Sequence, residues 1–147
     1  MRRIVFCLGV CGMALSLQAG NLAWLTSLPD AQAQAKKENK LVFIDVTGSD
    51  WCVFCKELDQ DVFQKPQFQD YAKTNLVLVQ IDFPAGIKQP PELEAANQAL
   101  TNRFAVEGFP TILALSPEGK VLWKQAGYLD GGPRAMIAQL EKAKKKQ

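Results

Sequence analysis

Two continuous apolar runs constrain the fold of this chain more than any other feature. Residues 41–46 are Leu-Val-Phe-Ile-Asp-Val and residues 76–81 are Leu-Val-Leu-Val-Gln-Ile, and both are rich in side chains that strands favour. Neither run alternates between apolar and polar residues, which is typical of strands covered on both faces. Because helical patterns separate the two runs, we expect parallel strands in a sheet that carries helices on each side.

Helical patterns and a hairpin account for most of the remaining chain. Helices are predicted at residues 28–40, 51–61, 66–74, 91–104 and 134–147. The fourth begins at Pro91, and four of its apolar residues have the spacing of one buried face: Leu93, Ala96, Leu100 and Phe104. Strands at 111–115 and 121–126 flank Ser-Pro-Glu-Gly, which is typical of a type I turn, so they are predicted to form an antiparallel hairpin.

The order of these elements predicts an α/β fold. Parallel crossovers come first and the hairpin last, so we expect a central mixed β-sheet with helices on both faces. A length of 147 residues suits one domain plus a short extra segment. Apolar residues make up 48% and charged residues 22% of the chain, as in ordinary globular proteins, which argues against disordered and repeat architectures.

Residues 1–19 have the pattern of a secretory signal peptide. Arg2 and Arg3 precede an uncharged stretch at 4–17, and the small residue Ala19 offers a cleavage site, which would leave residues 20–147 as the mature domain. The stretch is shorter than the roughly 20 residues of a membrane span; an uncleaved anchor or a buried core helix is the alternative. We therefore expect an exported protein, periplasmic or secreted, without stable membrane insertion after cleavage.

The charge balance argues against a nucleic-acid partner. The chain has 17 Lys and Arg against 15 Asp and Glu, and removal of Arg2 and Arg3 leaves a net charge of zero. Such a chain has no broad positive field to attract phosphates. The lysines near the C-terminus are interpreted as the solvated end of the last helix, where positive charge is favourable.

The chain has four cysteines and no histidine. Without histidine, Ser-His-Asp and Cys-His catalysis and histidine-ligated metal sites are excluded. Signal cleavage would remove Cys7 and Cys11 and leave Cys52 and Cys55. In an oxidising compartment such a pair is either a structural bridge or a redox centre.

The position of Cys52 and Cys55 favours the redox centre. The pair follows a predicted buried strand and a polar turn and stands where a helix begins. Unpaired backbone N–H groups and the helix dipole stabilise a thiolate there, so we expect Cys52 to be exposed, nucleophilic and moderately lowered in pKa. Cys55 lies one turn further on the same face, and we expect it to be more buried and to release mixed disulfides as the resolving thiol.

Two other uses of the pair are less favoured. Zinc needs four ligands, which two cysteines without histidine do not supply, so no metal site is predicted. A purely structural disulfide would close a very short loop, and stabilisation grows with loop length, so it would stabilise little. The structural bridge stays open as the alternative.

A further segment, Gly-Phe-Pro-Thr at 108–111, stands directly before the third predicted strand. Together with Val-Phe-Ile-Asp at 42–45 and Trp-Cys-Val-Phe-Cys-Lys at 51–56, it resembles the thioredoxin superfamily over about residues 28–145. The stretch Gly-Ser-Asp-Trp-Cys at 48–52 is more similar to exported bacterial thioredoxin-like proteins, and the chain also resembles the periplasmic thioredoxin-like domain of disulfide reductases.

The resemblance implies a three-layer thioredoxin-like sandwich and a cis bond between Phe109 and Pro110 that faces the cysteines. The backbone of Phe109 would pair with an extended substrate segment. Asp45 would be the buried acid that moves the proton of the second cysteine, although it lies one residue further from Cys52 than in thioredoxin itself. The lysine that often neighbours this acid would fall near Leu78 and is missing.

Two aromatic side chains complete the predicted site. Trp51 is expected to shield the cysteines and to contact substrate, and Phe54 is expected to form an apolar docking surface with Phe109. The dipeptide Val53-Phe54 is neither the Gly-Pro of thioredoxins nor the Pro-His of strong oxidants, so the direction of electron flow stays open, with reduction slightly favoured.

The sequence therefore predicts an exported thiol–disulfide oxidoreductase. It would exchange disulfides with protein substrates and with an electron donor or an oxidising partner, as a monomer and without a separate cofactor, because the cysteine pair holds the two electrons. One alternative is a non-catalytic peptide-binding module with a structural disulfide. A peroxidase-type thiol enzyme is less favoured, because the arginines that follow the signal peptide, Arg103 and Arg134, are far from Cys52 in sequence.

Overall fold

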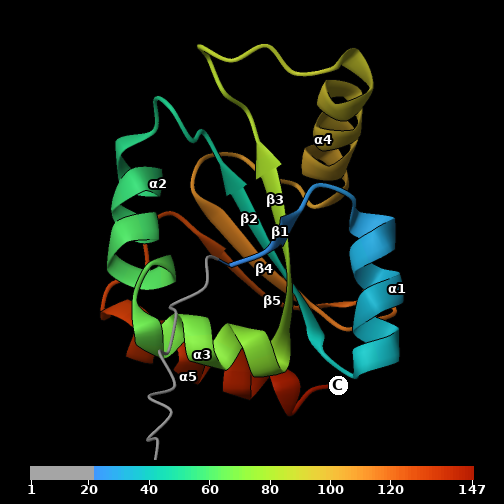
Figure 1. The fold of residues 1–147 in the computed structure, drawn as a ribbon, viewed down its shortest axis with the longest axis vertical. Coiled ribbons are helices and arrows are strands. Elements are labelled where there is room, and N and C mark those ends of the chain that lie inside the picture. Colours follow the sequence, from blue (N-terminus) through green and yellow to red (C-terminus); the bar gives the residue numbers. More distant parts are fainter. Residues whose placement is uncertain (1–21) are drawn as a thin grey trace, which may run out of the picture.

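The two apolar runs form the centre of the sheet. In a computed structural model, which describes residues 22–147, they are β2 (Leu41–Thr47) and β3 (Leu76–Asp82), and they pair in parallel. The hairpin of β4 (Thr111–Leu115) and β5 (Val121–Ala126) joins the other edge of β2 in the antiparallel sense. A short strand, β1 (Trp24–Leu25), pairs with β3 and gives the order β1-β3-β2-β4-β5 (Figure 1).

Helices cover both faces of this sheet (Figure 1). The helical elements are α1 (Leu28–Glu38), α2 (Val53–Leu58), the π-helical turn η1 (Asp59–Phe63), α3 (Pro66–Asn75), α4 (Pro91–Arg103) and α5 (Gly132–Lys144). On one face the apolar core is closed by α2, η1, α3 and α5, and on the other by α1 and the end of α4. The predicted three-layer α/β fold with a central mixed sheet is confirmed, while the predicted signal peptide lies outside the described residues.

The alternation of side chains along β2 decides which residues lie beneath α2. Phe43 belongs to the core on the α2 side, where its ring packs 5.6 Å from that of Phe68, and Ile44 belongs to the core on the α1 side. Successive residues of a strand point to opposite faces, so Asp45 shares the face of Phe43. Strand geometry alone therefore places a carboxyl group on the side of the sheet that carries the cysteines.

The segment after the cysteines differs from the predicted helix at 51–61. The α-helix begins at Val53 and changes at Asp59 into a π-helical turn, in which the N–H of Gln64 donates to the carbonyl of Asp59 at 2.9 Å. The wider turn leaves the neighbouring side chains of Val62 and Phe63 both buried. The spacing of apolar residues at 51–61 does not predict the change from an α-helix to a π-helical turn.

The prediction for the buried face of α4 is wrong at Ala96, which is exposed. Its place in the interior is taken by Asn97 and Thr101. The amide of Asn97 donates to the carbonyl of Asp82 at 3.0 Å, at the C-terminal end of β3. A polar side chain is needed there because a strand end leaves backbone groups that must be satisfied.

Candidate active site

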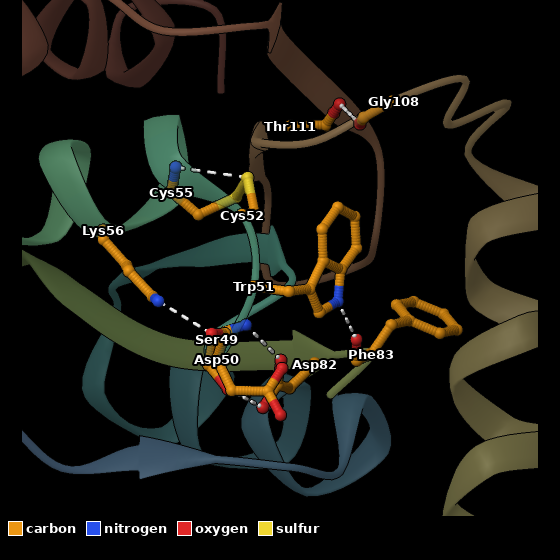
Figure 2. Close-up of a disulfide and its surroundings, with 10 residues drawn as sticks. All are labelled: Ser49, Asp50, Trp51, Cys52, Cys55, Lys56, Asp82, Phe83, Gly108 and Thr111. Atoms are coloured by element: carbon orange, nitrogen blue, oxygen red, sulfur yellow. Dashed lines mark hydrogen bonds between the residues drawn. A yellow bond between two sulfur atoms is a disulfide. The ribbon is translucent and has the colours of Figure 1, made fainter. Parts of the chain in front are cut away.

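The turn between β2 and α2 brings the cysteines to the edge of the sheet (Figure 2). Gly48 is required in this turn because a Cβ atom there would overlap the indole ring of Trp51. The N–H of Cys52 donates to the carbonyl of Gly48 at 2.8 Å, and Cys52 is the N-cap residue of α2. Its Sγ atom is disulfide-bonded to Cys55 and also accepts the Cys55 N–H at 3.3 Å.

Both cysteines are buried, with 6% of Cys52 and 5% of Cys55 exposed. The expectation that Cys52 is exposed is therefore wrong for the disulfide-bonded form. Its sulfur turns inward because it caps the helix and bonds to Cys55, while the neighbouring side chains project outward. Trp51, Val53 and Phe54 are 48%, 64% and 59% exposed, so they form the outer surface around the disulfide.

Asp45 is buried on the same side of the sheet, with 4% of its surface exposed. It lines a cleft beneath α2 together with Cys55 and with residues of β1, β2, the turn after β2, α2, η1 and β3: Trp24, Thr47, Ser49, Lys56, Asp59, Gln60 and Gln80. Asp45 and Cys55 thus line the same cleft, although Asp45 lies one residue further from Cys52 in sequence than the corresponding acid of thioredoxin. The strand register places Gln80, rather than Leu78, beside Asp45.

Burial raises the pKa of the Asp45 carboxyl to about 7. The Gln80 amide opposes this shift by hydrogen bonding, while the negative charges of Asp59 and Asp82 add to it. An acid with this pKa exchanges a proton readily near neutral pH, which is what a proton donor or acceptor for a thiol requires.

The loop before β4 contacts the turn that carries the cysteines. The peptide bond between Phe109 and Pro110 is cis, and the Thr111 hydroxyl donates to the Gly108 carbonyl at 2.7 Å. The Phe109 ring packs edge-on against Trp51, with the ring centroids 5.7 Å apart. Figure 2 shows the Trp51 indole lying close to the loop that carries Gly108 and Thr111.

Phe109 makes its aromatic contacts with two other residues of the site. Its partners are Trp51 and Phe83, the latter with centroids 5.5 Å apart, whereas Phe54 stands exposed on α2. Phe83 follows β3 and was not among the predicted site residues. Its backbone carbonyl also accepts a hydrogen bond from the Trp51 indole N–H at 2.7 Å.

The sequence model of one family, described as a thioredoxin-like domain, matches residues 28–144. The chain belongs to the thioredoxin-like family. Its match covers every element from α1 to α5, so the family assignment applies to the whole layered domain with its cysteine pair.

Relatives of this thioredoxin-like chain include named redox proteins. The disulfide bond reductase DsbH of Chlamydia pneumoniae is 33% identical over 129 residues, which cover 88% of this chain and 76% of that protein. The thiol:disulfide interchange protein DsbD of Cronobacter sakazakii is 35% identical over 111 residues, which cover 74% of this chain but only 17% of that protein.

Solved structures agree with these matches. The structure named DsbH oxidoreductase superposes with a TM-score of 0.80 at 31% identity, over 92% of this chain and 96% of that one. The C-terminal domain of DsbD from Neisseria meningitidis in its reduced form gives a TM-score of 0.59 at 26% identity, over 79% of this chain and 93% of that one. The predicted enzyme class, a thioredoxin-like thiol–disulfide oxidoreductase, is confirmed.

Residues 22–147 contain no helix that is both long and apolar enough to cross a membrane.

Three side chains of the thioredoxin-like site were missed from the sequence. Asp59 lines the cleft with Asp45 and Cys55, and Phe83 supports Trp51 and Phe109. Asp50 binds backbone N–H groups of the segment after β3. Asp59 had a sequence signal, because it lies four residues after Cys55 on a predicted helix, one turn further along the same face. The contacts of Phe83 and Asp50 join segments more than 25 residues apart, which local patterns do not reveal.

The raised pKa of Asp45 predicts how stability depends on pH in the disulfide-bonded protein. The unfolded chain loses this proton near pH 3.8 and the folded protein near pH 7, so the free energy of unfolding falls as pH rises between these values. Asp45→Asn removes this loss and is expected to be more stable than wild type above pH 7, by up to about 4 kcal/mol. Urea unfolding at a series of pH values measures the difference.

The matched control is Asp130→Asn, which changes an exposed aspartate far from the cysteine pair in sequence. Its stability curve should run parallel to that of wild type. If the Asp45→Asn curve also runs parallel to wild type between pH 4 and 8, Asp45 does not hold its proton in the folded protein.

Proposed function

We propose that this thiol–disulfide oxidoreductase is exported and reduces disulfides in proteins outside the cytoplasm. The observation that carries the proposal is the Cys52–Cys55 disulfide at the N-terminus of α2, with the Asp45 carboxyl and Cys55 lining one cleft. The relative named as a disulfide bond reductase supports the reducing direction. The absence of a histidine between the cysteines supports it too, because no additional positive charge favours the reduced thiolate.

The reaction begins from the dithiol form. The Cys52 thiolate attacks one sulfur of a substrate disulfide, so that a mixed disulfide forms and the other substrate sulfur leaves as a thiolate. Asp45 takes the proton of the Cys55 thiol, and the Cys55 thiolate then attacks the Sγ atom of Cys52. The second substrate sulfur leaves and is protonated, and the pair is left as the disulfide seen in this structure.

The surroundings of Cys52 supply the two features that attack requires. The N–H of Cys55 points at the Cys52 sulfur, and such a donor binds a thiolate more strongly than a neutral thiol. The helix N-terminus adds its positive potential, although α2 is only 6 residues long before it becomes η1. In the dithiol form these contacts would favour the thiolate of Cys52, which is the form that attacks a disulfide.

Substrate would bind across the surface around the disulfide. The backbone of Phe109, next to the cis bond to Pro110, would offer hydrogen-bonding groups to a substrate strand. Trp51 and Phe54, which are 48% and 59% exposed, give apolar contact on either side of Cys52. Protein disulfides are therefore the substrate class, and a second redox protein would return electrons to the oxidised pair.

Export rests on the first residues of the chain. Arg2 and Arg3, the uncharged stretch at 4–17 and the small residue Ala19 support secretion followed by cleavage. Expression of the full chain in a bacterial host should give a periplasmic protein whose intact mass equals that of residues 20–147. A protein that keeps Met1 in the cytoplasmic fraction would contradict export.

Activity should depend on both cysteines in different ways. Wild type is expected to accelerate insulin reduction by dithiothreitol, and Cys52→Ser is expected to fall to the uncatalysed rate because the attacking thiolate is lost. Cys55→Ser should still attack but not resolve, so it should accumulate a mixed disulfide with insulin on non-reducing gels. Equal rates for wild type and Cys52→Ser would instead identify a peptide-binding module with a structural disulfide.

The redox potential decides the direction of electron flow. We expect a potential at or below about −200 mV, in the range of reductases and far from the roughly −120 mV of a strong oxidant. Equilibration of the Cys52–Cys55 pair with glutathione buffers, followed by alkylation and mass measurement, gives the value. A potential near that of a strong oxidant would overturn the reducing direction and leave the enzyme class intact.

A further inference from the structure

Two carboxylates join the cysteine-bearing turn to the end of β3 and the segment that follows it. Figure 2 shows the contact between Asp82 and Ser49. The Asp82 carboxylate accepts hydrogen bonds from the N–H and the hydroxyl of Ser49, at 2.9 and 2.6 Å. In the opposite sense, the Asp50 carboxylate accepts the backbone N–H groups of Ala85 and Gly86, at 2.9 and 2.6 Å. We call these five residues the carboxylate clamp. The cysteine turn therefore supplies one carboxylate and two hydrogen-bond donors, and the end of β3 with the segment after it supplies the same.

Asp50 is the half of the clamp that lies next to the active site. It precedes Trp51 in the chain, and its backbone carbonyl accepts a hydrogen bond from the Lys56 ammonium of α2 at 2.7 Å. The two N–H groups that its carboxylate binds lower the pKa of Asp50, so the side chain is ionised at neutral pH. Charged acceptors make the stronger hydrogen bonds, which suits a clamp at the molecular surface.

Next to the clamp in sequence, Trp51 and Phe83 contribute to a group of three aromatic rings that leads to the cis-proline loop. The Trp51 indole N–H donates to the Phe83 carbonyl at 2.7 Å, between the two ends of the clamp. The Phe109 ring is packed between both residues, 5.7 Å from Trp51 and 5.5 Å from Phe83. A shift of the segment after β3 would therefore move the Phe83 ring and disturb the hydrogen bond that holds the Trp51 indole, which affects both aromatic contacts of Phe109.

We propose that Asp50 is a positioning residue that acts on substrate binding through Trp51, Phe83 and Phe109. Its carboxylate holds the segment after β3 against the cysteine turn. This segment in turn holds the ring of Phe109, and the backbone of Phe109 is the part that would bind the substrate. The sulfur chemistry belongs to Cys52, Cys55 and Asp45, which the carboxylate of Asp50 does not reach through any hydrogen bond seen in residues 22–147. The inference rests on the proposed reduction of protein disulfides.

The test separates binding from sulfur chemistry. Asp50→Ala is expected to raise KM for insulin disulfides by about five-fold, with kcat within two-fold of wild type, because two hydrogen bonds to a charged group are lost. Its rate with a small aromatic disulfide such as DTNB should equal that of wild type. Asp50→Asn keeps one acceptor oxygen and should give an intermediate KM. Asp130→Asn, an exposed aspartate outside the clamp, should behave as wild type.

A spectroscopic measurement tests the same inference without activity. Labelling with 5-fluorotryptophan gives one 19F resonance for each of the three tryptophans, and Trp51→Phe assigns its own. Asp50→Ala should shift the Trp51 resonance and leave those of Trp24 and Trp123 in place, which also shows that the variant is folded. The Asp130→Asn spectrum should match that of wild type.

The possible results distinguish the two proposals. An unchanged KM and an unshifted Trp51 resonance in Asp50→Ala would overturn the positioning role and leave the enzyme intact. An equal loss of rate with insulin and with DTNB would also overturn it, because Asp50 would then act on the sulfur chemistry itself. If wild type reduced neither substrate, the proposed function would fail, and the Trp51 resonance would still decide whether Asp50 holds the tryptophan.

Discussion

The hydrogen bond between the Cys55 N–H and the Cys52 sulfur is the interaction on which the site depends. A helix begins with N–H groups that have no partner in the helix, and an N-cap side chain usually supplies an oxygen for one of them. Here the cap is a sulfur atom, so the group that starts α2 is also the reactive group. Because a thiolate is a better acceptor than a thiol, the contact that completes the first turn of the helix would also favour the thiolate of Cys52 in the reduced protein.

The contact at Cys52 favours a charged group, whereas the burial of Asp45 disfavours one. Burial destabilises the carboxylate form of Asp45, which lines the same cleft as Cys55. A carboxyl group in this interior keeps its proton to a pKa of about 7, and the nearby Asp59 strengthens that effect. At neutral pH the carboxyl is therefore present in both its protonated and its ionised form, and in the proposed reaction the ionised form would accept the proton of Cys55. Strain of this kind is expected at functional sites, where one local rule of stability is broken for chemistry.

Much of this arrangement was predictable because it follows from local patterns. The apolar runs at 41–46 and 76–81 are long and continuous, and strand alternation then places Asp45 on the α2 side. The two residues of β1 are too few to form a pattern, and their strand exists only because β3 offers an edge. The inward turn of Cys52 and the partners of Phe109 depend on packing between distant segments, which residue spacing does not encode.

The distribution of these contacts along the chain separates reactivity from recognition. In the proposed function, the groups that would set the sulfur chemistry come from β2 and from α2 with η1, which are close in sequence and are joined by one turn. The surface that would meet substrate is assembled from the cysteine turn, the segment after β3 and the loop before β4, joined by the Trp51, Phe83 and Phe109 rings. Substitutions in the two distant segments can therefore alter which proteins bind while the cap of α2, and with it the reactivity of Cys52, stays unchanged.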